Sequence, residues 1–126
     1  MELGSSFLIP EFSGPGHLWV VTSRPDTPLG AAIFMLSTLR DHSKDRTCIL
    51  RPGEHEFVHH DTVVAYQRGV TLTVAEHEAL RKMGCCQLRT PFKPHVLARI
   101  QRGALASDFT PEKLKPLVAE TLRAAE

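Results

Sequence analysis

Residues 48–66 read CILRPGEHEFVHHDTVVAY and place two β-type apolar runs on either side of a polar segment. The runs at residues 47–50 and 62–67 have the β-branched and apolar content that is typical of strands. A Pro-Gly turn closes the first run, and residues 55–58 are expected to form a short edge strand. Strands this short and this close in sequence favour antiparallel pairing through tight turns.

Two more strands are expected upstream. Residues 17–23, HLWVVTS, combine β-branched and aromatic side chains, and residues 31–38, AAIFMLST, form a mostly apolar run. The second run has the pattern of a buried central strand. Residues 24–30 hold two prolines, an Asp and a Gly, and are expected to turn. Residues 1–16 are rich in Gly, Ser and Pro and are interpreted as an N-terminal arm or long loop with room for one short strand.

Downstream of these strands the pattern changes. The Arg-Gly pair at residues 68–69 is interpreted as a turn into a short strand at residues 70–72. The sequence TVAE that follows has the form of a capping box, and it predicts a helix over about residues 74–83 that a glycine ends. A last short strand is expected at residues 85–88.

The C-terminal part of the chain is expected to be helical. Residues 94–102 are interpreted as a helix that Gly103 ends. Thr110 is expected to be the N-cap of a third helix, with Pro111 at its first position. Pro116 predicts that this helix kinks or starts late.

A chain of 126 residues is long enough for one domain with one core. The order of elements predicts a mainly β protein with C-terminal helices (β+α), in which the strands close as a small antiparallel barrel. The expected organisation is an arm at residues 1–16, a barrel with one helix at residues 17–92, and a helical segment of the same domain at residues 93–126.

Composition narrows the classes of function. The net charge of +1 excludes a globally basic nucleic-acid binder. Residues 81–102 nevertheless carry six cations and no carboxylate, which form either a phosphate-binding stripe or a solvated helix face. Six Phe, one Trp and one Tyr are few for a base-stacking platform. Three cysteines without a C-x-x-C pair indicate a reducing compartment, and the protein is expected in the cytoplasm.

Signals for membranes and cofactors are missing from the sequence. No apolar run approaches the ~18 residues that span a bilayer, and the first residues lack the pattern of a signal peptide. No Walker loop, G-x-G-x-x-G or G-x-S-x-G motif occurs, and no cofactor is expected. The spacing C-x6-H-x3-H fits no strong zinc pattern, and no metal site is expected, although zinc-ligand types are supplied by Cys48, His55, His59, His60 and Asp61.

Three segments resemble the PemK/MazF toxins, a family of small endoribonucleases with an SH3-like barrel from toxin–antitoxin pairs. LWVVTSRPD resembles the family's first long strand and polar turn, and IFMLSTLR resembles its apolar strand that ends in a hydroxyl residue. HHDTVVAYQRGVTLTVAEHEAL resembles its strand, short turn, strand and helix start. The likeness covers roughly residues 17–80. It implies an SH3-like barrel that acts on single-stranded RNA without a metal, a cognate antitoxin as partner, and a homodimer.

The same resemblance implies where catalysis takes place. The matching positions are His17, before the first long strand, and Ser37 and Thr38, at the end of the second. His55 is a further catalytic candidate, because it follows a tight turn and because histidine changes charge near neutral pH. The Arg-Pro pair that is typical of the family's first long strand is replaced here by Gly16-His17. A guanidinium fork binds two phosphate oxygens at once, so the candidates for the phosphate-binding cation are Arg24, Arg40 and Arg46.

A second interpretation keeps the barrel without the chemistry. The protein would then be a non-catalytic module that binds a protein or peptide partner, and its histidines would be incidental. The missing Arg-Pro pair favours this interpretation, whereas the histidine-rich segment favours the enzyme. Geometry discriminates between them: an enzyme requires imidazoles and hydroxyls on one concave surface with an Arg nearby.

Overall fold

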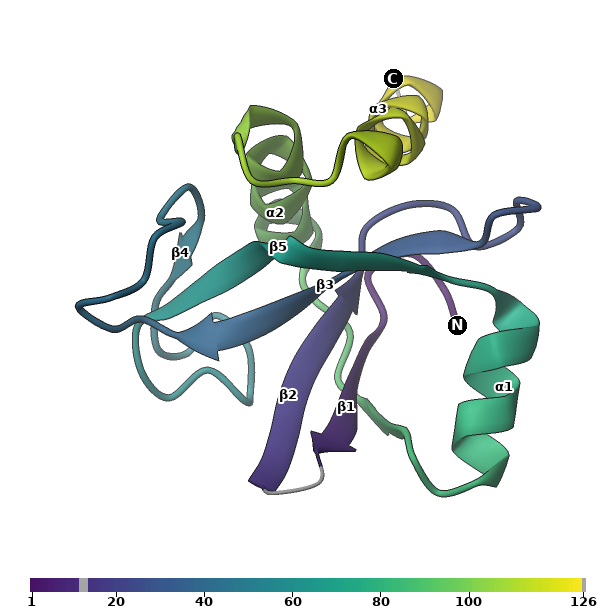
Figure 1. Ribbon diagram of the computed structural model, residues 1–126, viewed down its shortest axis with the longest axis horizontal. Coiled ribbons are helices and arrows are strands. Elements are labelled where there is room, and N and C mark those ends of the chain that lie inside the picture. The colour runs from purple at the N-terminus through teal and green to yellow at the C-terminus, as the bar shows by residue number, and fades with distance from the viewer. Residues whose placement is uncertain (12–13, 126) are drawn as a thin grey trace.

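The computed structural model describes residues 1–11 and 14–125 (Figure 1). Its strands are β1 Ser6–Glu11, β2 Gly14–Val21, β3 Ala31–Thr38, β4 Ile49–Leu50, β5 Thr62–Leu72 and β6 Gln87–Arg89. Its helices are α1 Val74–Lys82, α2 Pro94–Ala106, the 3-10 helix η1 Glu112–Leu114 and α3 Lys115–Ala124. None of the helices in the described ranges is long and apolar enough to cross a membrane.

The strands form one antiparallel sheet in the order β4-β5-β3-β2-β1-β6. The sheet curls, but within residues 1–11 and 14–125 no pairing joins its edge strands β4 and β6 (Figure 1). The expected class, mainly β with C-terminal helices, is confirmed. The segment expected to be an N-terminal arm contains β1, which lies inside the sheet between β2 and β6.

Alternation along the strands gives each face of the sheet its own apolar core. Phe34 of β3 lies in the core beneath α2 and α3, together with Tyr66 of β5 and Ile100 of α2. The rings of Phe34 and Tyr66 meet edge to face, with their centroids 5.2 Å apart. The neighbouring Ile33 belongs to the core on the opposite face, where Leu80 of α1 packs. β3 is therefore the buried central strand that its apolar run predicts.

β5 runs without interruption through the pair at residues 68–69, where a turn was expected. The register against β3 shifts there, from Ile33 opposite Val70 to Met35 opposite Ala65. Gly69 serves close packing, because a Cβ at this position would lie 2.4 Å from Cε1 of Phe34. The prediction of a turn was wrong because the glycine makes room for a core side chain.

The prediction that Gly103 ends α2 was also wrong. The helix continues to Ala106, and Gly103 lies inside it. A Cβ at residue 103 would lie 2.1 Å from Oη of Tyr66, which donates a hydrogen bond of 2.7 Å to the carbonyl oxygen of Ile100. This glycine lets a buried tyrosine approach the helix.

The helix starts differ in how well local signals predict them. The capping box of α1 is present, since Thr73 Oγ1 accepts from the amide of Glu76 and the Glu76 side chain accepts from the amide of Thr73. α3 starts late, at Lys115, as Pro116 predicts. Thr110 is not its N-cap, because Thr110 Oγ1 is buried and has no hydrogen-bond partner among the described residues.

The expected edge strand at residues 55–58 is absent. This segment lies in a compact loop, in which the amide of Val58 donates to the carbonyl oxygen of His55 over 2.9 Å. The amide of Gly53 donates to the carbonyl oxygen of Val58 over 3.1 Å. Backbone groups that a strand would have presented to a neighbour are thus used within the loop.

Candidate functional site

A pocket opens where β2 and β3 separate. Their ladder runs only from Trp19 opposite Met35 to Val21 opposite Ile33, so the start of β2 diverges from the end of β3 (Figure 1). The pocket has a volume of about 380 Å³. This β2–β3 pocket is lined by Leu8, Gly16, His17, Leu18, Leu36, Ser37, Thr38, Arg40, Phe57, Val58 and Thr62.

His17 enters the β2–β3 pocket from the start of β2 and is half-buried. Its Nδ1 lies 3.1 Å from the carbonyl oxygen of Leu36, which can only accept, so Nδ1 is the donor. In a neutral ring, Nε2 then carries the lone pair. Gly16 precedes it with a φ of +86°, and a Cβ there would lie 2.2 Å from the carbonyl oxygen of Ile9. The glycine therefore fixes the direction from which His17 enters.

Ser37, Thr38 and Arg40 reach the same pocket from the end of β3. The backbone of Arg40 is held on both sides, because its amide donates to Ser43 Oγ over 2.9 Å and its carbonyl oxygen accepts from Arg46 Nη2 over 2.9 Å. Its guanidinium is exposed and makes no hydrogen bond or ion pair within the described ranges. It remains available to an anionic group in the pocket.

The end of β3 also borders two further hollows. One, of about 300 Å³, is here named the β3–β5 pocket, and it is lined by Met35, Ser37, Thr38, Arg40, His42, Ser43, Lys44, Asp45, Val63, Ala65, Gln67 and Arg68. The other is shallow and brings Thr38 and Arg40 beside His59, His60 and Asp61. Thr38 and Arg40 border all three hollows, so the end of β3 is their common wall.

His55 does not line the β2–β3 pocket. It is buried, its Nε2 donates to the carbonyl oxygen of Thr90 over 2.6 Å, and its Nδ1 accepts from the amide of Phe57 over 3.1 Å. Its ring lies 4.4 Å from the ring of Phe92, centroid to centroid. Burial lowers the pKa of His55, which favours the neutral ring that these bonds require. His55 therefore organises the loop at residues 51–58.

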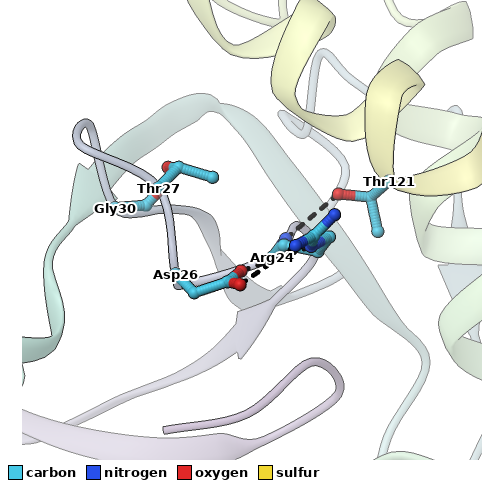
Figure 2. A network of polar contacts seen from close by, with 5 residues as sticks. All are labelled: Arg24, Asp26, Thr27, Gly30 and Thr121. Carbon is cyan, nitrogen blue, oxygen red and sulfur yellow. Dashed lines mark hydrogen bonds and ion pairs between the residues drawn. The ribbon is translucent and has the colours of Figure 1, made fainter. Parts of the chain in front are cut away.

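The side chains of Arg24 and Arg46 make their contacts outside the β2–β3 pocket. Arg24 forms an ion pair with Asp26 at 3.0 Å, and its amide donates to Thr121 Oγ1 of α3 (Figure 2). Arg46 donates from its guanidinium to carbonyl oxygens of its own loop, at Arg40, Asp41 and Ser43. Neither residue borders the β2–β3 pocket.

Two cations of the β3–β5 pocket, Lys44 and Arg68, were not among the residues singled out from the sequence. Lys44 lies in a charged loop whose path depends on Asp45, a buried carboxylate that accepts from Thr47 and from Ser107 Oγ of the α2 C-cap. Arg68 was assigned to a turn that does not exist. For Arg68, the available signal would have been a strand that continues through the Arg-Gly pair and exposes the Arg side chain.

The described residues hold no group of three or more His, Cys, Asp or Glu side chains that could bind a metal ion. Cys48 is buried, and burial raises the pKa of its thiol. Comparisons with protein-family models, with curated proteins and with solved structures found no match for this chain. Function is therefore argued from the pockets themselves.

Proposed function

We propose that this protein is a divergent PemK/MazF-like, toxin-type endoribonuclease that cleaves single-stranded RNA without a metal. The observation that carries the proposal is the meeting of His17, Ser37, Thr38 and Arg40 in the β2–β3 pocket. These residues come from two strands that separate, and they supply a base, two hydroxyl donors and a cation to one hollow of about 380 Å³. A phosphodiester needs that combination for cleavage by its own 2′-hydroxyl.

The proposed reaction forms one bond and breaks one. Nε2 of His17 takes the proton of the 2′-hydroxyl while the 2′-oxygen attacks phosphorus. The bond from phosphorus to the 5′-oxygen breaks, that oxygen takes a proton from water, and a 2′,3′-cyclic phosphate remains. The protonated His17 then returns its proton to the hydroxide that the water has become. The hydroxyls of Ser37 and Thr38 donate to the non-bridging oxygens, and the guanidinium of Arg40 stabilises their negative charge.

The proposal extends to fold, partners and location. The curled sheet is then an SH3-like barrel that has opened between β4 and β6, and the apolar edge of such a barrel is readily covered by a second copy in a homodimer. A cognate antitoxin would hold the nuclease inactive, and the cytoplasm would supply both antitoxin and RNA. The thiol of Cys48, buried and unpaired, suits a reducing compartment.

One observation favours a different function, a non-catalytic module that binds a protein or peptide. The lining of the β2–β3 pocket also includes the apolar side chains of Leu8, Leu18, Leu36, Phe57 and Val58. Such a lining suits an apolar side chain of a partner. The cation and the hydroxyls of the same pocket favour the phosphate, so the nuclease remains the conclusion.

The test is incubation of the purified protein with a mixed-sequence RNA, with products resolved by length and by their 2′,3′-cyclic ends. His17→Ala is expected to lower the cleavage rate by about 10²–10⁴-fold. His17→Asn is the sharper variant, because an amide can still donate to the Leu36 carbonyl oxygen but cannot act as the base. His95→Ala, at an exposed histidine on the first turn of α2, is the matched control. RNA that stays intact at high protein concentration would refute the nuclease.

A further inference from the structure

The β3–β5 pocket adjoins the β2–β3 pocket directly. The two hollows share Ser37, Thr38 and Arg40 as a common wall. Successive residues of a strand point to opposite sides of a sheet, so hydroxyls at adjacent positions can serve both sides of the strand end. A polymer that enters one hollow can therefore continue over the end of β3 into the other.

Charge makes the β3–β5 pocket a second site for an anion. It brings together Arg40, Lys44 and Arg68, and none of these side chains forms a hydrogen bond or ion pair within the part of the chain that the structure describes. Its carboxylate, Asp45, is buried and saturated, because Oδ2 accepts from Ser107 Oγ over 2.6 Å and Oδ1 accepts from Thr47. Unpaired cations around a hollow raise the local concentration of anions and bind phosphate.

The shallow hollow beside His59, His60 and Asp61 lacks this excess of positive charge. Of its lining residues, Arg40 carries a positive charge and Asp61 a negative one, and Asp61 is already paired with Arg51 at 2.6 Å. Its other lining residues are Thr38, Leu39, Pro52, His59 and His60. A polyanion that leaves the β2–β3 pocket is therefore drawn toward Lys44 and Arg68.

We infer that the β3–β5 pocket binds a second phosphate of the same single-stranded nucleic acid, next to the phosphate in the β2–β3 pocket, through Arg40, Lys44 and Arg68. This inference rests on the proposed function, because the first phosphate occupies the proposed catalytic pocket. It adds the substrate's path, across the end of β3, and its minimum length of two consecutive phosphodiesters.

The test measures binding rather than cleavage. Labelled 2′-O-methyl RNA, which lacks the attacking hydroxyl, is titrated as dinucleotide, trinucleotide and hexanucleotide against the wild-type protein and the variants Lys44→Ala and Arg68→Ala. Lys82→Ala on α1 and Arg102→Ala on α2 remove exposed cations elsewhere and are matched controls. Each titration is repeated over a range of salt concentrations.

We expect the trinucleotide to bind about tenfold more tightly than the dinucleotide, since a second charge-assisted phosphate contact is gained. Lys44→Ala and Arg68→Ala should abolish that gain and lower the salt dependence of trinucleotide binding by a slope of about 0.7 each. The controls should bind all lengths as the wild type does. Equal affinity for the two shorter lengths, or equal weakening by Lys44→Ala and Lys82→Ala, overturns the inference.

Further measurements distinguish the second phosphate site from the proposed catalysis and from binding of an acidic protein. If the trinucleotide result holds but natural RNA is never cleaved, the two phosphate sites stand and the proposed catalysis fails. If RNA is cleaved but dinucleotides bind and react as well as longer strands, catalysis stands and the second site fails. A poly-glutamate peptide that displaces the trinucleotide as well as an oligonucleotide of equal charge does overturns the inference in favour of an acidic protein partner.

Discussion

Substitution of His55 tests whether this histidine acts in folding or in chemistry. The structure places it in a buried hydrogen-bonded position beside Phe92, outside the β2–β3 pocket. We expect His55→Ala to destabilise the protein and to lower cleavage by the folded fraction far less than His17→Ala does, although Phe57 and Val58 of its loop line the pocket. His17→Ala should do the opposite, with little loss of stability and a large loss of cleavage.

The expected cost of His55→Ala follows from the contacts it removes. The amide of Phe57 loses its acceptor, and the carbonyl oxygen of Thr90 loses one of two donors but keeps Ser6 Oγ at 2.6 Å. Each lost bond is partly buried and costs about 1 kcal/mol, because the partner left behind can be partly rehydrated. Removal of the ring from its packing against Phe92 adds about 1–2 kcal/mol. The free energy of unfolding should fall by about 3–4 kcal/mol.

Conservative variants separate the contributions of the two hydrogen bonds to this loss of unfolding free energy. His55→Asn can place an oxygen near the Nδ1 position and keep the bond from Phe57. His55→Gln can place an amide nitrogen near the Nε2 position and keep the bond to Thr90. Each should lose about 2 kcal/mol, which is roughly half of the alanine effect. Urea unfolding followed by tryptophan fluorescence of Trp19 measures all three variants.

The pH dependence of the free energy of unfolding is an independent test of the structural role of His55. Burial lowers the pKa of His55 in the folded protein, and burial lowers the pKa of His77 in the same direction. The unfolded chain therefore binds more protons below a pH of about 6.5, and the free energy of unfolding falls as the pH drops from there toward 5. His55→Gln should flatten this fall in part. An unchanged unfolding midpoint in His55→Ala, together with lost RNA cleavage, would refute the structural role.

Three further outcomes are expected from urea unfolding. Gly103→Ala should lower the free energy of unfolding by about 2 kcal/mol or more, because the new Cβ would lie 2.1 Å from Tyr66 Oη, and this outweighs the better helix propensity of alanine. In a Tyr66→Phe background most of that loss should disappear. Thr73→Ala removes the capping box of α1 and should cost about 1 kcal/mol. His77→Leu removes a buried Nε2 without a partner among the described residues, so stability at neutral pH should hold and the acid sensitivity should decrease.

Local patterns in the sequence predicted the elements whose causes are local. The apolar run of β3 predicted a buried central strand, and the sequence TVAE predicted the start of α1, because a capping box needs only residues within one turn. Glycines at positions 69 and 103 were misinterpreted as a turn and a helix end. Each makes room for a side chain far away in the sequence, Phe34 or Tyr66, and no local pattern records such a neighbour.

The candidate site was predictable in part for the same reason. Ser37 and Thr38 end β3, and His17 lies in the part of β2 that is not paired with β3, so these side chains reach an open hollow. The role of His55 depends on Thr90, which is far away in the sequence and comes beside it only in the folded chain. Arg46 was a candidate for the phosphate-binding cation. Its guanidinium instead donates to carbonyl oxygens of its own loop, a contact that composition cannot indicate.

The length of the β2–β3 ladder decides whether the β2–β3 pocket exists. The ladder stops at Trp19 opposite Met35, and beyond it the carbonyl oxygen of Leu36 accepts from the ring of His17. If the ladder continued, the start of β2 would lie against Ser37 and Thr38, and no hollow would open between the two strands. The separation of two strands, rather than any one side chain, is thus the feature on which the proposed catalytic pocket depends.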